Sequence, residues 1–224
     1  LLFSSSVRTL LTAMVLAGSV VGGAAVAPLP QDRVSSGASS ASAGTVDSTA
    51  LRTALKIVAF GDSLTSGHRL PKSDAYPAIL ERSLRESGLP FTVVNHGVNG
   101  DTTAGALRRL DLALAEKPQI LIVAFGANDG LRGVPVTQVR ANLEKIIERA
   151  KDDDIEVLLV GMEALPLYGW QYTIDFHHVF PDLAAKYDIP LVPFMLNGVL
   201  GNPELVAQEG IHPNAAGPKL IAGN

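Results

Sequence analysis

The chain has 224 residues, with 18 Lys and Arg against 22 Asp and Glu, a formal net charge of −4 and no cysteine. The absence of cysteine excludes disulfides, thiolate metal sites and a cysteine nucleophile. No basic stripe of the kind that phosphate backbones require occurs along the sequence, so nucleic acid is not an expected partner. The part after the first fifty or so residues is long enough, at about 170 residues, for a single hydrophobic core.

Residues 1–27 are predicted to form a secretory signal peptide. Arg8 precedes an apolar stretch from Leu10 to Val21, and the segment ends in Ala-Val-Ala at Ala27. A charge, an apolar core and small residues are the pattern of an export signal. The alternative is a retained anchor, but the strongly apolar part is shorter than the roughly 20 residues of a membrane span. We expect cleavage near Ala27, export to the periplasm or the medium, and no stable membrane span afterwards.

Residues 28–54 are rich in Ser, Ala and Gly and are predicted to form a flexible linker. The folded domain is expected to span 55–224. Its last helix is expected to begin after Asn214-Ala215-Ala216, and the chain stops a few residues later, so this helix is interpreted as truncated.

From residue 56 onward, short apolar runs alternate with amphipathic segments, which is typical of βαβ units around a parallel sheet. The continuous apolar run at 120–125 fits a strand covered on both faces. We therefore predict a flavodoxin-like three-layer α/β/α sandwich with a five-stranded parallel sheet. The expected strands are 56–61, 92–95, 119–125, 156–161 and 190–194, and the expected helices are 75–87, 103–116, 136–152 and 172–187.

Ser63 follows Gly61-Asp62 at the carboxyl end of the first expected strand. Open α/β sheets place their chemistry at that edge. A serine hydroxyl needs a base to become a nucleophile, and His212 is the strongest candidate. Glu209, three residues earlier, would accept the other ring N–H and fix the tautomer. The alternative for Ser63 taken alone is a helix N-cap or turn residue.

Two further motifs place glycine and amide groups at the same edge. Gly100 follows the second strand, and Asn128 follows the third within Gly126-Ala127-Asn128-Asp129-Gly130. A tetrahedral oxyanion needs converging N–H donors. The backbone N–H groups of Gly100 and Ser63 and the side-chain amide of Asn128 are therefore the expected oxyanion hole.

These blocks resemble those of the SGNH, or GDSL-type, hydrolases, in which Ser63, Gly100, Asn128 and His212 match the four residues of the family name. The sequence is most similar to the bacterial branch of multifunctional thioesterases, lysophospholipases and arylesterases. The motifs that carry this likeness are Gly-Asp-Ser-Leu-Thr at 61–65, Gly-Asp-Thr at 100–102, Gly-x-Asn-Asp-Gly-Leu-Arg-Gly at 126–133 and Gly-Ile-His-Pro-Asn at 210–214. The resemblance implies hydrolysis of esters or thioesters through an acyl-enzyme, without a metal or organic cofactor.

The chain departs from the family pattern at Glu209, where the family usually has Asp. Glutamate is longer by one methylene, so either the loop retreats by about an ångström or the contact with His212 is strained. The alternative is that Glu209 is a solvated loop acid and that another group orients the ring.

The other histidines and acids near the motifs are expected to be structural. Adjacent histidines diverge by about 100° on a helix, which disfavours a metal site at His177-His178. We interpret His96 as strand-end packing, His68 as an exposed loop residue, and Asp62 and Asp129 as hydrogen-bonding braces of their turns.

The resulting hypothesis is a secreted serine esterase acting on short to medium acyl or aryl esters, with lysophospholipids as a further substrate class. Two alternatives stay open: a carbohydrate acetyl esterase, and a catalytically silent binding module on the same scaffold. Six apolar residues are candidates for the acyl surface: Leu64, Leu131, Leu165, Leu167, Tyr168 and Trp170.

Overall fold

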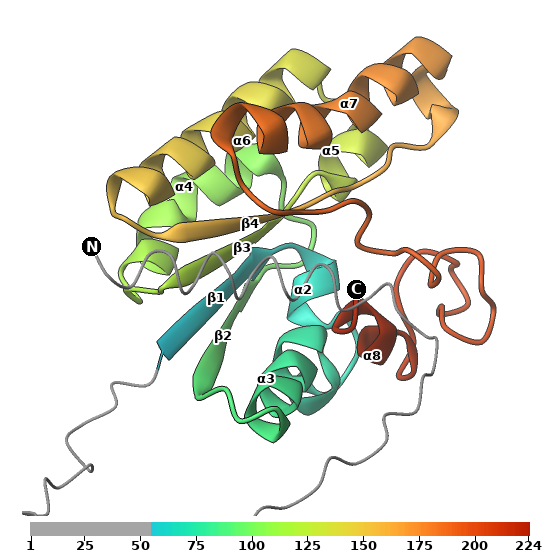
Figure 1. Ribbon diagram of the computed structural model, residues 1–224. Coiled ribbons are helices and arrows are strands. Elements are labelled where there is room, and N and C mark those ends of the chain that lie inside the picture. Colours follow the sequence, from blue (N-terminus) through green and yellow to red (C-terminus); the bar gives the residue numbers. More distant parts are fainter. Residues whose placement is uncertain (1–54) are drawn as a thin grey trace, which may run out of the picture.

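The computed structural model describes residues 55–224, and the predicted signal peptide and linker lie outside the described residues. Strands and helices alternate along this part of the chain, as the apolar periodicity predicts (Figure 1). The five strands are β1 (Leu55–Gly61), β2 (Phe91–Gly97), β3 (Ile120–Ala124), β4 (Glu156–Val160) and β5 (Leu191–Val192).

The strands form one parallel sheet in the order β2-β1-β3-β4-β5. β1 lies between β2 and β3, so the chain reverses its direction of winding after β2. Ligands of open α/β sheets bind outside the carboxyl ends of strands at such a switch point. Ser63 follows β1 at this place.

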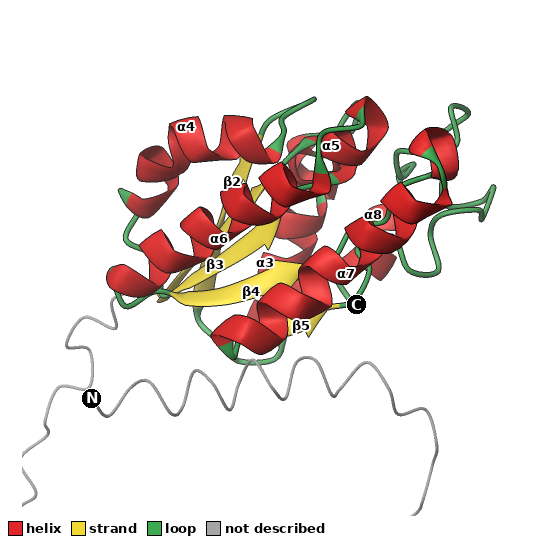
Figure 2. Ribbon diagram, turned by 90° about the horizontal axis from the view of Figure 1, so that it is seen from above, coloured by secondary structure: helices red, strands yellow, loops and turns green. Residues whose placement is uncertain are grey.

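Helices cover both faces of the sheet, which confirms the predicted three-layer α/β/α sandwich. α3 (Tyr76–Glu86) and α8 (Gly217–Ile221) lie on one face, and α4 (Thr103–Leu114), α6 (Val136–Asp152) and α7 (Trp170–Tyr187) lie on the other (Figures 1 and 2). The remaining helical segments are short: α2 (Ser63–Ser66), η1 (Lys72–Asp74), α5 (Ala127–Arg132) and η2 (Pro166–Tyr168).

The core follows the patterns that predict these elements. In α6, Val139, Leu143, Ile146 and Ile147 are fully buried, at the three- and four-residue spacing of an amphipathic helix. All five residues of β3 are buried, as expected for a strand with helices on both faces. Among the largest fully buried side chains are Phe60, Phe125, Phe176 and Phe180.

The structure differs from the predicted elements at two strands. β5 is limited to two residues, because Pro190 and Pro193 flank it and cannot donate to the ladder. β2 extends two residues beyond its predicted end, with Gly97 paired to Gly61. The helices α2 and α5 were not predicted, since segments of four and six residues are too short for periodicity to reveal.

Glycines at the ends of β1 and β2 let α2 pack directly on the sheet. A Cβ atom at Gly61 would lie 2.0 Å from Oγ1 of Thr65, and one at Gly97 would lie 2.2 Å from the backbone nitrogen of Ser66. Only a residue without Cβ permits this close approach. The two glycines therefore fix the position of the segment that carries Ser63.

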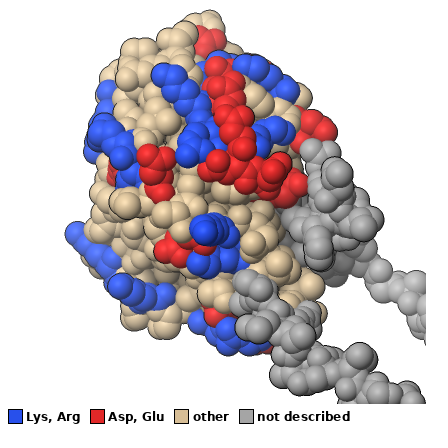
Figure 3. Space-filling model, turned by 90° about the vertical axis from the view of Figure 1, so that its left-hand side faces the viewer, with Lys and Arg blue, Asp and Glu red and all other residues tan. Residues whose placement is uncertain are grey.

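Within residues 55–224, no helix combines the length and the apolar character that a membrane crossing requires. On the face shown in Figure 3, Lys and Arg side chains are interleaved with Asp and Glu side chains.

Candidate active site

Ser63 is the first residue of α2, and its turn is held by the neighbouring Asp62. Oδ1 of Asp62 accepts a hydrogen bond from the backbone N–H of Leu64 at 2.9 Å, which is a helix N-cap. Gly67, in the left-handed conformation at φ 73°, ends the helix after one turn. Ser63 is therefore at a helix start, with its backbone N–H available to a bound group.

A short closed loop carries both Glu209 and His212. An antiparallel bridge joins Val206 to Pro213, and the N–H of Ala207 donates to the carbonyl of His212 at 2.8 Å. Gly210, at φ 79°, allows the sharp turn between them. The loop places the acid and the histidine on the same side of the chain, before α8 begins.

The loop brings His212 to Ser63, although the two residues are 149 positions apart in the sequence. Nε2 of His212 lies 3.0 Å from Oγ of Ser63, and Nδ1 lies 3.1 Å from Oε1 of Glu209. The longer glutamate thus reaches the ring at an ordinary hydrogen-bond distance. This arrangement is suited to a proton transfer from Ser63 to His212 while Glu209 accepts the Nδ1–H.

The environment keeps the histidine neutral and the glutamate charged near neutral pH. Burial and the neighbouring His68 lower the pKa of His212, while the hydrogen bond to Glu209 opposes that change. The backbone N–H of Glu209 and the contact with His212 hold the pKa of the Glu209 carboxyl below its usual range. A neutral imidazole beside a serine hydroxyl is the form that acts as a base.

Asn128 and Gly100 lie at the same edge of the sheet as Ser63. Nδ2 of Asn128 donates to Oδ2 of Asp62 at 3.2 Å, which leaves its second N–H free to bind another acceptor. The carbonyl of Gly100 accepts from the guanidinium of Arg132 at 2.9 Å, so this loop is tied to α5. The N–H of Gly100 has no hydrogen-bond acceptor among residues 55–224.

Asp62 and Asp129 are fully buried and brace their turns by hydrogen bonding, as predicted. The carboxylate of Asp129 accepts from the backbone N–H of Thr103 at 2.9 Å and from its hydroxyl at 2.7 Å. Burial raises the pKa of Asp62 to about 7 and also raises the pKa of Asp129.

Arg109 on α4 is a residue that the sequence reasoning missed. Its guanidinium donates to Asp101 Oδ2 at 2.7 Å and to the carbonyls of His96 and Gly61 at 2.8 Å. It also lies 4.5 Å from the centroid of the Phe60 ring. Arg109 therefore links the ends of β1 and β2 to the loop of Gly100. Arg109 lies three residues after Ala106 and four before Ala113, and both alanines are fully buried. This helical spacing is the sequence signal that places Arg109 on the buried face of the helix.

The prediction that His68 is an exposed loop residue is wrong. Its ring is partly buried against the ring of His212, with 4.5 Å between the centroids. The loop after α2 turns back at Gly67, which brings His68 over the site.

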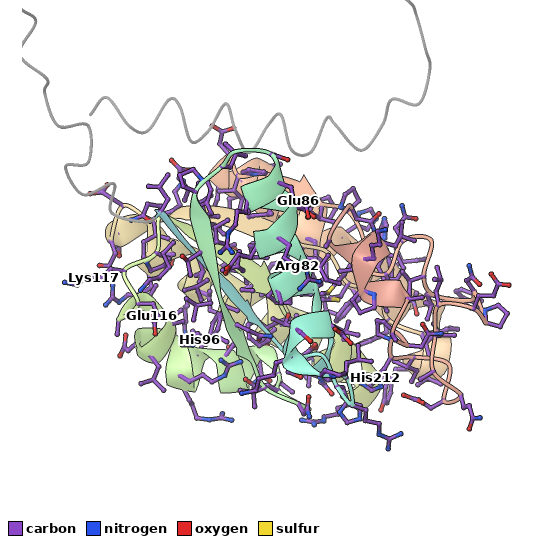
Figure 4. All side chains as sticks on the ribbon, turned by 90° about the horizontal axis from the view of Figure 1, so that it is seen from below. Arg82, Glu86, His96, Glu116, Lys117 and His212 are labelled. Carbon is purple, nitrogen blue, oxygen red and sulfur yellow. The ribbon has the colours of Figure 1, made fainter. Side chains whose placement is uncertain are left out.

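The other histidines lie apart from Ser63. His96 faces Glu116 across 3.7 Å, as expected for strand-end packing, and both lie well away from His212 in Figure 4. Nδ1 of His177 contacts Glu163 at 2.7 Å. Across residues 55–224, no three His, Asp or Glu side chains are grouped as metal ligands would be.

Five of the six residues expected to form the acyl surface are exposed, and one is buried. Leu64 belongs to the core with 6% of its surface exposed, because the N-cap turns it toward the sheet, so its prediction was wrong. The other five residues are exposed, with Trp170 at 72%. The hydroxyl of Tyr168 donates to the carbonyl of Leu131, which joins the segment around η2 to α5.

Comparison with known proteins identifies the family to which the chain is similar. Residues 59–220 match the GDSL-like Lipase/Acylhydrolase family. The chain is 36% identical over 168 residues to an arylesterase of Vibrio mimicus, covering 75% of this chain and 84% of the relative. It is 35% identical over 167 residues to thioesterase 1/protease 1/lysophospholipase L1 of Escherichia coli K12, covering 74% and 79%. The crystal structure of TesA superimposes with a TM-score of 0.71 at 36% identity, covering 75% of this chain and 93% of TesA.

A parallel α/β sheet with a Ser-His-acid arrangement at its carboxyl edge defines a serine hydrolase scaffold. The chain belongs to the GDSL-like lipase/acylhydrolase family, as the family match over 59–220 and these relatives show. It is a carboxylic ester hydrolase of the arylesterase and thioesterase type.

Proposed function

We propose that this protein is an exported serine esterase that hydrolyses acyl or aryl esters and thioesters through an acyl-enzyme. The observation that carries the proposal is the hydrogen-bonded series from Ser63 Oγ through His212 to Glu209, at 3.0 and 3.1 Å. His212 takes the proton from Ser63 as Oγ attacks the carbonyl carbon, and returns it to the leaving group. Water then attacks the acyl-enzyme by the same proton transfers and releases the acid.

In this mechanism, the N–H groups of Ser63, Gly100 and Asn128 bind the oxyanion. Each has an N–H without an acceptor among the described residues, and two of the three belong to the backbone. Fixed donors of this kind stabilise charge that appears only in the transition state. The Asp62 carboxylate accepts one N–H of Asn128 and so holds this side chain in place.

The proposed substrates carry short to medium acyl chains or aryl groups, and lysophospholipids are a further class. The exposed apolar side chains of Leu131, Leu165, Leu167, Tyr168 and Trp170 support this choice, because they offer apolar surface on α5, which carries Asn128, and on the segment that Tyr168 joins to α5. The names of the Vibrio mimicus and Escherichia coli relatives, an arylesterase and a thioesterase/lysophospholipase, point to the same substrates. The proposal of export rests on the signal pattern of residues 1–27.

The test is hydrolysis of nitrophenyl esters and acyl thioesters of increasing chain length by the protein and by its Ser63→Ala variant. We expect turnover by the variant to fall at least about a thousandfold, because the nucleophile is lost. Ser63→Ala should melt at the wild-type temperature, since the side chain is small. Near-normal turnover by Ser63→Ala would overturn the proposal. Acetylxylan serves as the comparison substrate, since preferential deacetylation would indicate a carbohydrate esterase.

A further inference from the structure

The imidazole of His68 covers one face of the His212 ring. The ring centroids are 4.5 Å apart, and the planes are inclined by 39°. The two hydrogen bonds of His212, to Ser63 and Glu209, are made by its nitrogens at the edge of the ring. These bonds act in the plane of the ring, so they restrain rotation of the ring out of that plane only weakly. A side chain packed on the face of the ring opposes that rotation.

The backbone connects His68 firmly to the nucleophile. The N–H of His68 donates to the carbonyl of Ser63 at 3.1 Å, and Gly67 makes the left-handed turn between them. The hydroxyl of Ser66 donates to the same carbonyl at 3.2 Å. One hydrogen-bonded turn therefore joins the two residues, and both contact His212 from this short segment.

His68 also influences the charge of His212. Nδ1 of His68 is buried and has no hydrogen-bond partner, the one such side-chain atom within residues 55–224. The charged groups that face His212 are Arg69, on the same loop as His68, and Glu209, on its own loop. Arg69 opposes protonation of His212, and Glu209 favours it.

We propose that His68 is a positioning residue, whose ring holds the His212 imidazole between Ser63 and Glu209. The inference rests on the proposed esterase mechanism. It adds a residue that the expected set of Ser63, His212 and Glu209 does not contain. His68 also lowers the pKa of His212, in agreement with this contact.

The experiment compares wild type with His68→Phe, which keeps a flat ring, and His68→Ala, which removes it. His178→Ala, an exposed histidine on α7, is the matched control. Turnover of nitrophenyl butyrate is measured from pH 5 to 9. The pKa of His212 is measured independently by NMR on imidazole-labelled protein, so this readout does not require catalysis. Circular dichroism confirms that each variant is folded.

We expect His68→Ala to lower kcat about tenfold, since loss of orientation is costly in rate, and His68→Phe to stay within about threefold of wild type. His68→Ala should raise the pKa of His212, because removal of the covering ring exposes the His212 imidazole to solvent. Wild-type kcat and an unchanged His212 titration in His68→Ala would overturn the inference. A loss of kcat in His68→Phe as large as that in His68→Ala would also overturn it. If wild type itself hydrolyses no ester, the proposed function fails. The His212 titration then still tests whether the His68 ring acts on His212.

Discussion

Asn128 donates a hydrogen bond from Nδ2 to Oδ2 of Asp62 at 3.2 Å, and Asp62 is fully buried. The second carboxylate oxygen, Oδ1, accepts from the N–H of Leu64 at 2.9 Å. One carboxylate therefore holds both the turn that carries Ser63 and the side chain of the proposed oxyanion donor. A change in the charge of Asp62 acts on both.

The first prediction concerns the pH dependence of stability at Asp62. Burial raises its pKa to about 7 in the folded protein, from an ordinary value of 3.8. Between these values, the folded protein binds a proton that the unfolded chain has released, so the free energy of unfolding falls as pH rises. Asp62→Asn removes this contribution. From pH 5 to pH 7, the free energy of unfolding of wild type should fall by about 1–3 kcal/mol relative to that of the variant.

Urea denaturation at the two pH values measures this difference. Titration of all other groups is shared by the two proteins, so it cancels in the comparison. A difference between wild type and Asp62→Asn that stays constant from pH 5 to pH 7 would show that Asp62 titrates at its ordinary value.

The second prediction is that Asn128→Ala lowers kcat by a factor on the order of 10²–10³ with little change in KM. An oxyanion donor interacts mainly with the transition state, so substrate binding is largely preserved. Steady-state kinetics on nitrophenyl butyrate gives both constants. Asn197→Ala, at an exposed position, is the control and should stay within about twofold of wild type. A change confined to KM would make Asn128 a residue that positions the substrate.

The third prediction separates the charge of Glu209 from its length. Glu209→Gln should lower kcat at least about a hundredfold, because a neutral amide cannot stabilise the imidazolium. Glu209→Asp keeps the charge and should be much milder. Because the carboxylate raises the pKa of His212, Glu209→Gln should also move the acidic limb of the pH–rate profile to lower pH. Activity of Glu209→Gln equal to wild type from pH 5 to 9 would leave a Ser-His pair oriented by another group.

The fourth prediction tests the link that Arg109 makes between strand ends. Arg109→Met leaves the Asp101 carboxylate without its cation, and the side chains of this pair are 17% and 11% exposed. Breaking such a pair should cost about 3–5 kcal/mol in the free energy of unfolding. Arg149→Met is the control. Its pair with Asp153 is 47% and 42% exposed and should be worth about 1 kcal/mol or less. Equal losses in the two variants, measured by urea denaturation, would contradict the role of Arg109.

The sequence was sufficient for the parts of the fold that rest on local periodicity. The buried stripe of α6 and the apolar run of β3 are at their predicted positions, and the order of motifs places Ser63, Asn128 and His212 at one edge. A local spacing also indicated that Glu209 would reach His212, although only the structure shows that the extra methylene fits at 3.1 Å.

Contacts between distant segments could not be predicted from the sequence. The packing of His68 on His212 joins a turn after β1 to a loop near the end of the chain, and no periodicity reports it. The three hydrogen bonds of Arg109 depend on how β1, β2 and α4 meet. Leu64 was misplaced for a related reason, since the side of α2 that faces the core is set by the N-cap at Asp62.

The most direct test of the account is the residue that a fluorophosphonate labels. Such a probe reacts only with a serine activated by a neighbouring base. Intact-mass and peptide mass spectrometry should find one adduct, on Ser63, and labelling should be abolished in Ser63→Ala and strongly slowed in His212→Ala. An adduct on another residue, or equal labelling of Ser63→Ala and wild type, would contradict the assignment of Ser63 as the nucleophile.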